Sequence, residues 1–175
     1  MVIKTAMRVL FGMLVISVWV LGSSIQAGAE TMHYKFYTWV IKSDIVPFGD
    51  VEGHTVDIMV RGAFYVFDSG EIATIKHVGT HDLIMGSGTF MQYVSINFQD
   101  GSTIMIKSEG TTVGGSTPGV VTAGGWKSEI IKGTGRFQGL KGTQSASAKY
   151  LPVEPGEAGP KGHGEGTITY TLPSK

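Results

Sequence analysis

Two histidines, His77 and His81, have the four-residue spacing that places both imidazoles of a zinc site on one face of a helix. The stretch that contains His77, IATIKHV at 72–78, alternates apolar and polar residues and is predicted to be a strand. On a strand this spacing separates two residues by about 13 Å, which is too far for them to share one ion. We therefore expect no metal site, and we place His77 at the polar edge of an apolar face.

Charged side chains in the predicted strands are the next candidates for chemistry. Four of them lie in or beside strands, where an inward charge would need a partner or a ligand: Arg61, Glu109, Glu129 and Arg136. If Glu109 or Glu129 faces a cavity beside a tyrosine such as Tyr93, it could act as a general acid or base with a raised pKa. The alternative is that these carboxylates point outward to solvent or pair across a subunit interface.

The glycine-rich stretch KGTGRFQGLKGT at 132–143 resembles a phosphate-binding loop only superficially. Its spacing is G-x-G-x-x-x-G, whereas a dinucleotide-binding loop needs G-x-G-x-x-G before a helix. The residues that follow, TQSASAKYLP, carry no apolar stripe for a helix, and no Walker spacing is present. We interpret the stretch as a connection between antiparallel strands in which Phe137 turns inward and plugs the barrel end. Its glycines would relieve the backbone where other residues clash: Gly133, Gly135, Gly139 and Gly142.

A hydrolase triad is not favoured either. His81 and Asp82 lie near several serines, but the sequence has no G-x-S-x-G elbow. The Gly86-Ser87-Gly88 stretch lacks the strand-to-helix turn that exposes a nucleophile.

The elements that must position these residues are β-strands. From Glu30 onward the chain shows short alternating runs separated by glycine-rich punctuation. The candidate strands are 33–42, 54–62, 63–67, 72–78, 89–98, 103–110, 126–132, 143–151 and 166–172. Eight or nine strands fit one closed antiparallel β-barrel, so the predicted fold class is all-β. Two stretches rich in glycine and proline, 111–125 and 152–165, are expected to be long loops.

Two turns set the expected register. Asp100-Gly101 is typical of a two-residue type I′ hairpin, which would oppose Phe98 and Thr103. One face of that hairpin would then carry Tyr93, Ser95, Asn97, Ile104, Ile106 and Ser108. The same arithmetic at Ser69-Gly70 groups His77 with Phe64, Val66, Ala73 and Ile75. Because neither face is purely polar, we expect the outer wall to be covered by partner subunits or another layer.

The first 29 residues are predicted to be a cleaved export signal. Lys4 and Arg8 precede a 13-residue apolar run, and Ala27-Gly28-Ala29 supplies the small residues of a cleavage site. The run is shorter than the roughly 20 residues of a membrane span, and no cysteine follows it for lipid attachment. The signal is bacterial in style, so we expect a periplasmic or secreted protein whose single domain is 30–175.

Composition excludes several partner classes. Without Lys4 and Arg8, 12 of the 14 basic residues remain against 14 acidic ones, and no basic tract is present, so nucleic acid is not an expected partner. The absence of cysteine means that packing and sheet closure, not disulfides, must stabilise an exported chain. Stretches such as 126–132 and 143–150 offer no continuous lipid-facing apolar band, so an outer-membrane barrel is not expected.

Three glycine-containing stretches resemble a known family. GTGRFQGLKGT at 133–143, taken with GSGTF at 86–90 and FQDGSTIMIKSEGT at 98–111, is similar to the allene-oxide-cyclase-like and dirigent-like barrels, whose late hairpin carries a related glycine run. The resemblance covers roughly 33–172 and implies an eight-stranded antiparallel barrel, often trimeric, with an apolar cavity and no metal or organic cofactor. The shared residues are scaffold glycines and the turn, so the resemblance assigns no catalytic residue.

These observations predict an exported, cofactor-free barrel that binds a small apolar or aromatic molecule. Aromatic residues crowd 34–39 and 64–67, and such rings suit a pocket for a flat or greasy ligand. The expected ligand-binding residues are Tyr93, Ser95, Asn97, Trp39 and His77, and the catalytic candidates are Glu109, Glu129 and Tyr93. Such a barrel could act as a cofactor-independent cyclase or isomerase or as a stereo-directing protein. The alternative is a non-catalytic carrier or a structural barrel with a packed interior.

Overall fold

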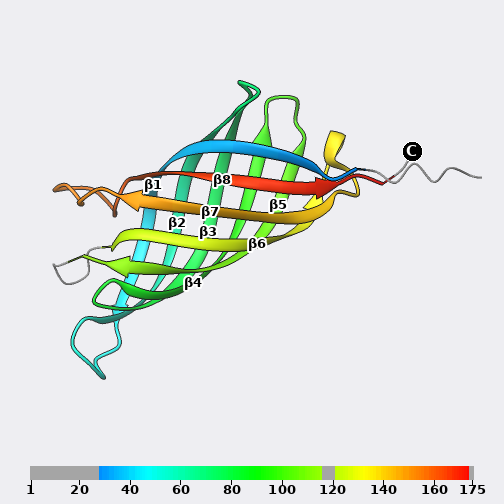
Figure 1. Cartoon of the computed structure of the whole chain (residues 1–175). Helices are drawn as coiled ribbons and strands as arrows, with labels where there is room; N and C mark the ends of the chain where they lie inside the picture. The colour runs from blue at the N-terminus through cyan, green and yellow to red at the C-terminus, as the bar shows by residue number, and fades with distance from the viewer. Residues whose placement is uncertain (1–27, 116–120, 174–175) are drawn as a thin grey trace, which may run out of the picture.

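The protein is a closed antiparallel β-barrel of eight strands (Figure 1). The computed structural model describes residues 28–115 and 121–173. Each strand pairs with its sequence neighbours, and β1 pairs with β8 to close the barrel. The strands are β1 (Glu30–Pro47), β2 (His54–Phe67), β3 (Ile72–Ile84), β4 (Ser87–Phe98), β5 (Thr103–Gly114), β6 (Val121–Gly133), β7 (Lys141–Tyr150) and β8 (Gly162–Thr171). A 3₁₀ helix, η1 (Gly135–Phe137), lies between β6 and β7.

The predicted all-β barrel is therefore confirmed, with differences in where strands begin and end. Residues 54–62 and 63–67, predicted as two strands, form the single strand β2. Residues 111–125, predicted as a loop, belong largely to β5 and β6. Glycine inside a strand misled the prediction here, because it weakens a strand without ending it when both neighbours supply a full ladder. Residues 1–27 of the predicted export signal fall outside the described residues.

The connections fall at two ends of the barrel. One end, here called the closed end, holds the β2–β3 and β4–β5 turns and the η1 connection. The other end, here called the mouth, holds the β1–β2, β3–β4 and β7–β8 connections together with the end of β5 and the start of β6 (Figure 1). The two ends differ in packing: the closed end is filled by side chains, and a cavity opens at the mouth.

The two turns at the closed end are longer than the sequence predicts. The Phe98 N–H donates to the Ser102 carbonyl oxygen over 3.0 Å, and the Gly101 N–H donates to the Phe98 carbonyl oxygen over 3.1 Å. Residues 99–101 therefore form a three-residue loop between the paired Phe98 and Ser102, with Gly101 at φ 82° as in a type I turn followed by a glycine bulge. The β2–β3 turn repeats this pattern, with Gly70 at φ 83°. The prediction of two-residue loops is wrong.

This extra turn residue moves the strand register by one position. Asn97, not Phe98, pairs with Thr103, and Tyr65, not Val66, pairs with Ala73. Because a one-residue change reverses which faces of two strands meet, the predicted groupings of side chains do not hold. The inward face of β4 and β5 carries Gln92, Val94, Ile96, Phe98, Ile104, Ile106 and Ser108.

The closed half of the barrel is packed solid. Its largest fully buried side chains are Tyr34, Tyr65, Phe36, Ile96, Ile104, Ile106 and Ile168. The rings of Tyr34 and Tyr65 stack with their centroids 4.2 Å apart. At the very end Phe137 is 3% exposed and lies 4.8 Å from Phe98 and 6.0 Å from Tyr170, ring centre to ring centre. The prediction that Phe137 turns inward to plug the barrel is confirmed.

Glycines make the η1 plug sterically possible. Gly135 and Gly139 have φ values of 60° and 78°, which side-chain-bearing residues rarely adopt. A Cβ atom on Gly133 would lie 2.0 Å from the Phe137 carbonyl oxygen, so no larger residue fits there without backbone movement. The glycine run serves the turn, as the sequence predicts.

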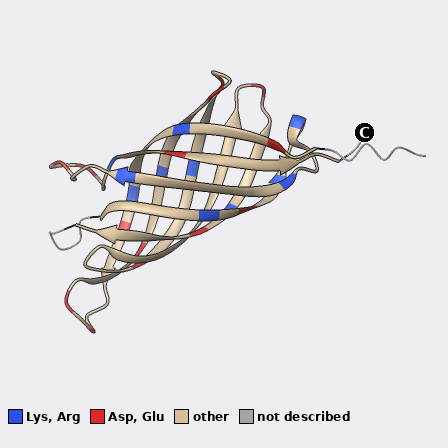
Figure 2. Cartoon of the chain, viewed as in Figure 1, with Lys and Arg blue, Asp and Glu red and all other residues tan. Residues whose placement is uncertain are grey.

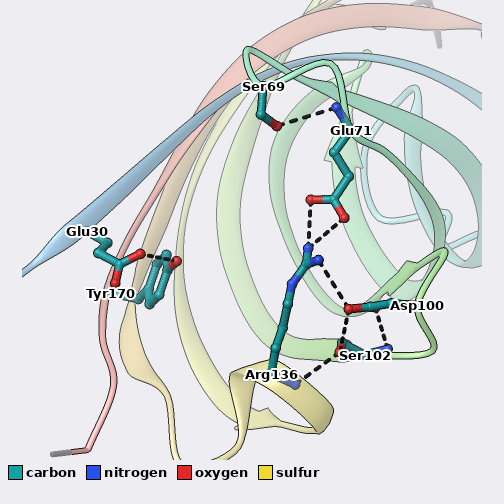
Figure 3. A network of polar contacts seen from close by, with 7 residues as sticks. All are labelled: Glu30, Ser69, Glu71, Asp100, Ser102, Arg136 and Tyr170. Carbon is teal, nitrogen blue, oxygen red and sulfur yellow. Dashed lines mark hydrogen bonds and ion pairs between the residues drawn. The ribbon is translucent and has the colours of Figure 1, made fainter.

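An ion cluster covers the plug from outside (Figure 3). The Arg136 guanidinium donates to both carboxylate oxygens of Glu71, over 2.7 and 2.6 Å, and to Asp100 over 3.1 Å. The same guanidinium lies 4.7 Å from the ring centres of Phe98 and Phe137. This cluster joins the β2–β3 turn, the β4–β5 turn and η1 into one cap.

The outer wall is substantially apolar. Exposed large side chains on β1 to β4 include Tyr37 at 64%, Ile58 at 56%, Tyr93 at 51% and Phe64 at 46%. Acidic and basic positions are interspersed over the strands in the view of Figure 2. Among the described residues, no helix is both long enough and apolar enough to cross a membrane.

Candidate functional site at the barrel mouth

A cavity of about 320 Å³ opens at the mouth of the barrel. Its lining comes from six strands and the β7–β8 connection, and its apolar part includes Ile45, Met59, Leu83, Val121, Leu151 and Val153. Its polar lining includes Ser43, Asp57, Arg61, His81, Tyr150 and Glu157. The cavity thus combines apolar walls with several polar groups, a combination found in small-molecule sites.

Strand β2 carries the central polar residues because of its alternation. Asp57, Met59 and Arg61 continue the inward row that Ala63 and Tyr65 form in the closed half. The inward face of β2 is therefore apolar over its last half and carries two charged residues over its first half. The change occurs at Arg61, which marks the floor of the cavity.

A β-bulge in β1 decides which residues of that strand reach the cavity. The register between β1 and β2 shifts between Val40 and Lys42. Without the extra residue, Lys42 and Asp44 would continue the inward row of Val40; with it, Ser43 and Ile45 face the cavity. Lys42 and Asp44 instead form an exposed ion pair of 2.7 Å on the outer wall.

Arg61 is buried, at 8% exposed, and its partners are neutral. Its guanidinium donates to the Pro160 carbonyl oxygen over 2.8 Å, to Thr38 Oγ1 over 3.4 Å and to Met59 Sδ over 3.4 Å. It also lies 5.0 Å from the centre of the Tyr150 ring. Burial lowers the pKa of Arg61, but an arginine in a protein remains protonated.

Asp57 and His81 form a buried pair across β2 and β3. The Asp57 Oδ1 atom lies 2.7 Å from His81 Nδ1 and also accepts from the His81 backbone N–H over 3.2 Å. Asp57 is 7% exposed. A carboxylate on Nδ1 holds the imidazole with that nitrogen protonated and leaves Nε2 for other contacts. The pair has the arrangement of an oriented base beside a cavity.

Tyr150 closes the cavity from β7 and is a phenol at neutral pH. Burial raises the pKa of Tyr150, although the positive charge of Arg61 acts in the opposite direction. The ring therefore offers an apolar face and a hydroxyl group to the cavity.

Polar residues also continue below the cavity floor. Ser108 Oγ lies 2.7 Å from Ser128 Oγ, which donates to Gln144 Oε1 over 2.6 Å, and the Gln144 amide donates to the Tyr34 hydroxyl. His77, paired with Arg61 across the sheet, has its Nδ1 3.3 Å from Gln92 Oε1 and its buried Nε2 without a hydrogen-bond partner. Burial, aided by the charge of Arg61, lowers the pKa of His77 to about 4. This histidine is neutral at physiological pH.

Of the residues predicted to bind ligand, His77 is the one that points into the barrel. Tyr93 is exposed on the outer wall, and Ser95 and Asn97 lie beside it and bond to each other over 3.0 Å. Trp39 packs on the outer wall against Phe64, with ring centres 5.3 Å apart. For Tyr93, Ser95 and Asn97 the register is the reason, since the predicted two-residue turn grouped them with Ile104 and Ile106, which the structure places inside the barrel.

The catalytic candidates Glu109 and Glu129 are also exposed, on the outward faces of β5 and β6. Glu109 pairs with Lys107 over 2.9 Å. Both carboxylates thus follow the alternative in which strand charges face solvent. Neither lines the mouth cavity.

Sequence reasoning missed Asp57 and Tyr150 as cavity residues. It singled out Arg61 as a strand charge in need of a partner and His81 for its spacing, but it did not join them. Alternation alone did not indicate Asp57, because the opposite face of the same stretch, which carries Val56, Ile58, Val60, Phe64 and Val66, is the more apolar of the two. His77 and His81 belong to no group of three or more potential metal ligands within 28–115 and 121–173.

Comparison with known proteins gives a likeness of fold. No family model matches the chain, and no curated protein matches it. It is similar to the solved structure of the pterocarpan synthase dirigent protein PsPTS1, with 20% identity over 85% of this chain and 97% of that chain and a TM-score of 0.49. It is similar also to the pterocarpan synthase dirigent protein GePTS1, with 20% identity over 91% of this chain and 97% of that one and the same TM-score of 0.49. Both are dirigent proteins, and the dirigent-like barrels are among those that the glycine run of this chain resembles.

Proposed function

We propose that this barrel is an exported, cofactor-free protein that binds a small apolar or aromatic molecule in its mouth cavity. In this proposal the cavity restricts the conformers of its ligand and excludes water. It could then direct a cyclisation or isomerisation through shape and one or two polar groups. The observation that carries the proposal is a cavity of about 320 Å³ in which the buried side chains of Asp57 and Arg61 lie among apolar residues such as Met59 and Leu83.

The size and composition of the cavity support a ligand role. Small-molecule sites typically enclose about 300 to 1,000 Å³ and combine apolar walls with a few convergent polar groups. Burying an arginine and an aspartate costs stability, which a purely structural barrel would avoid by placing apolar residues there. The cavity lies at the low end of the size range, so it favours a compact ligand.

The rival proposal is a carrier without catalysis or a structural barrel. The packed closed half, with Tyr34, Phe36 and Tyr65 fully buried, is what a structural barrel would show along its whole length. The mouth half departs from that pattern. A carrier and a stereo-directing protein would both need the cavity, so a binding experiment separates these two from the structural barrel.

The apolar outer wall supports a further part of the proposal, a homo-oligomer, which the family resemblance makes a trimer. Exposed Tyr37, Ile58 and Phe64 would be covered in such an assembly. Light scattering coupled to size exclusion tests this part, and a monomer at micromolar concentration would remove it.

The decisive experiment is a titration of the purified chain, without its first 29 residues, with the fluorescent apolar probe 1-aminoanthracene. We expect saturable binding, which Met59→Trp abolishes because Met59 lines the cavity and the larger ring fills it. The matched control is Ile58→Trp, one residue away on the same strand but 56% exposed on the outer wall, which should bind as the unmodified protein does.

Two outcomes would contradict the proposal. If no probe binds, the structural barrel is the better reading; if probe binding is lost equally in both tryptophan variants, the site is not the mouth cavity. Native mass spectrometry of protein purified from its own exported fraction would then identify the bound molecule, if the proposal holds.

A further inference from the structure

The buried positive charge of Arg61 has no negatively charged partner among the described residues of the mouth cavity. Among the described residues no carboxylate lies within ion-pair distance of its guanidinium, although the group is buried. Its hydrogen bonds go to a backbone carbonyl, a hydroxyl and a thioether, and all three acceptors are neutral. A guanidinium has five N–H donors, so donors remain for another acceptor.

The acidic groups of the cavity are already engaged elsewhere. Asp57 accepts from both the ring and the backbone of His81, and Glu157 is paired with Lys161. Asp57 influences Arg61 only through space, without a direct contact. The unmet requirement of the site is therefore for an anion and not for a cation.

A second unpaired group lies in the same lining. Ser43 Oγ is buried and has no hydrogen-bond partner among the described residues, and Ser43 lines the cavity. A hydroxyl and a guanidinium that face one cavity offer donors to the same oxygen-bearing group. Buried polar groups are normally satisfied, so an unpaired hydroxyl and an unpaired charge in one lining favour a ligand that carries an acceptor.

We propose that the ligand of the mouth cavity is a carboxylic acid with a compact apolar or aromatic body. This inference rests on the proposed function and adds the chemical class of the ligand. The carboxylate pairs with the Arg61 guanidinium at the cavity floor, a geometry that accepts two parallel N–H···O bonds. The body of the ligand packs against Met59, Leu83 and the Tyr150 ring, which line the same space.

The test uses three compounds of similar size that share one ring system and carry substituents of different charge. They are 2-naphthoic acid, 2-naphthalenemethanol and 2-naphthylmethylamine, which at neutral pH are an anion, a neutral molecule and a cation. Isothermal titration calorimetry measures their dissociation constants. We expect the acid to bind about 30-fold more tightly than the alcohol, since truncating a buried charge pair costs that order of affinity, and the amine to bind most weakly.

Two variants locate the effect at Arg61. Arg61→Met keeps the length of the side chain without its charge and should bring the acid down to the affinity of the alcohol while leaving the alcohol unchanged. Arg61→Lys keeps the charge without the planar fork and should retain part of the preference. The control is Lys149→Met on the outer face of β7, beside Tyr150, which removes the same charge near the mouth and should leave the preference intact.

The outcomes separate this inference from the proposed function. If 1-aminoanthracene binds but the acid and the alcohol bind equally, or the amine binds best, the carboxylate assignment is wrong and the cavity still binds ligand. If the preference survives Arg61→Met, the anion site lies elsewhere. If neither the probe nor any naphthalene binds, the proposed function fails and this inference with it. Should Arg61→Met fail to fold, the ranking of the three compounds on the unmodified protein still decides.

Discussion

His77 should make the barrel less stable in mild acid. It is 4% exposed, its Nδ1 faces Gln92, and its buried Nε2 has no acceptor for a second proton. Burial, with the charge of Arg61, lowers the pKa of His77 from 6.5 to about 4. Protonation of His77 is therefore less favourable in the native state than in the unfolded chain.

The sign and size follow from this difference. Between pH 6.5 and about pH 4 the unfolded chain binds the proton and the native state does not, so the free energy of unfolding falls as the pH falls. Each pH unit of that window is worth about 1.4 kcal/mol, so His77 removes about 3 kcal/mol in total. Below the window both states are protonated, and this contribution stops changing.

The assay is urea unfolding followed by circular dichroism at several pH values across that window. His77→Gln, which keeps a polar partner for Gln92, should flatten the pH dependence by about 3 kcal/mol relative to the unmodified protein. The pH dependence of the variant must be subtracted from that of the unmodified protein, because other histidines also contribute. The raised pKa of His54, beside Asp50 and Asp82, stabilises the native state as the pH falls, which is opposite to the effect of His77.

The matched control is His163→Gln, which changes an exposed histidine on β8 and should keep the original slope. Equal slopes for His77→Gln and the unmodified protein would refute the reasoning, because His77 would then have to be accessible to water or to an acceptor in the native state.

The closed end supports two further predictions. Arg136→Met should lower the free energy of unfolding by about 1 kcal/mol, because its partly exposed guanidinium pairs with Glu71 and stacks on Phe137. The loss should be smaller in high salt, which screens the ion pair. A loss that is independent of salt would mean that packing alone is involved. Gly133→Ala should destabilise the protein several-fold more than Gly125→Ala. An added Cβ atom would lie 2.0 Å from a carbonyl oxygen at position 133, but 3.9 Å from its nearest neighbour at position 125. Equal melting temperatures in differential scanning calorimetry would contradict this steric account.

The position of the mouth cavity could not be predicted from alternation alone. Tyr93, Ser95 and Asn97 have the parity of outward residues once the β4–β5 turn has three residues, and the inward parity belongs to Gln92 and Val94. Both turn lengths are compatible with an Asp-Gly dipeptide, because each places the glycine at a positive φ angle. The choice of turn length therefore decides which face of β4 is grouped with the buried face of β5, and the two-residue turn selected the outward face.

The bulge in β1 likewise decides which side chains face the interior, but within a single strand. Nothing in the stretch VIKSDI distinguishes a regular strand, which would bury Lys42 and Asp44, from a bulged strand, which brings in Ser43 and Ile45. Only closure against β2 resolves the question, because an inward Lys42 would compete with Arg61 for the same cavity. Side-chain pairing between strands far apart in sequence thus selects the local irregularity.

The amino-acid sequence by itself determined the all-β class, the approximate number of strands and the inward turn of Phe137. These depend on local properties: a period of two in hydrophobicity and glycines where the backbone needs positive φ angles. The tertiary structure alone decided that the interior is solid at one end and hollow at the other, and that Asp57, Arg61, His81 and Tyr150 meet at the hollow end. The physical reason is that those four residues come from three strands, and the distance between them is set by strand register and barrel closure, which no local pattern encodes.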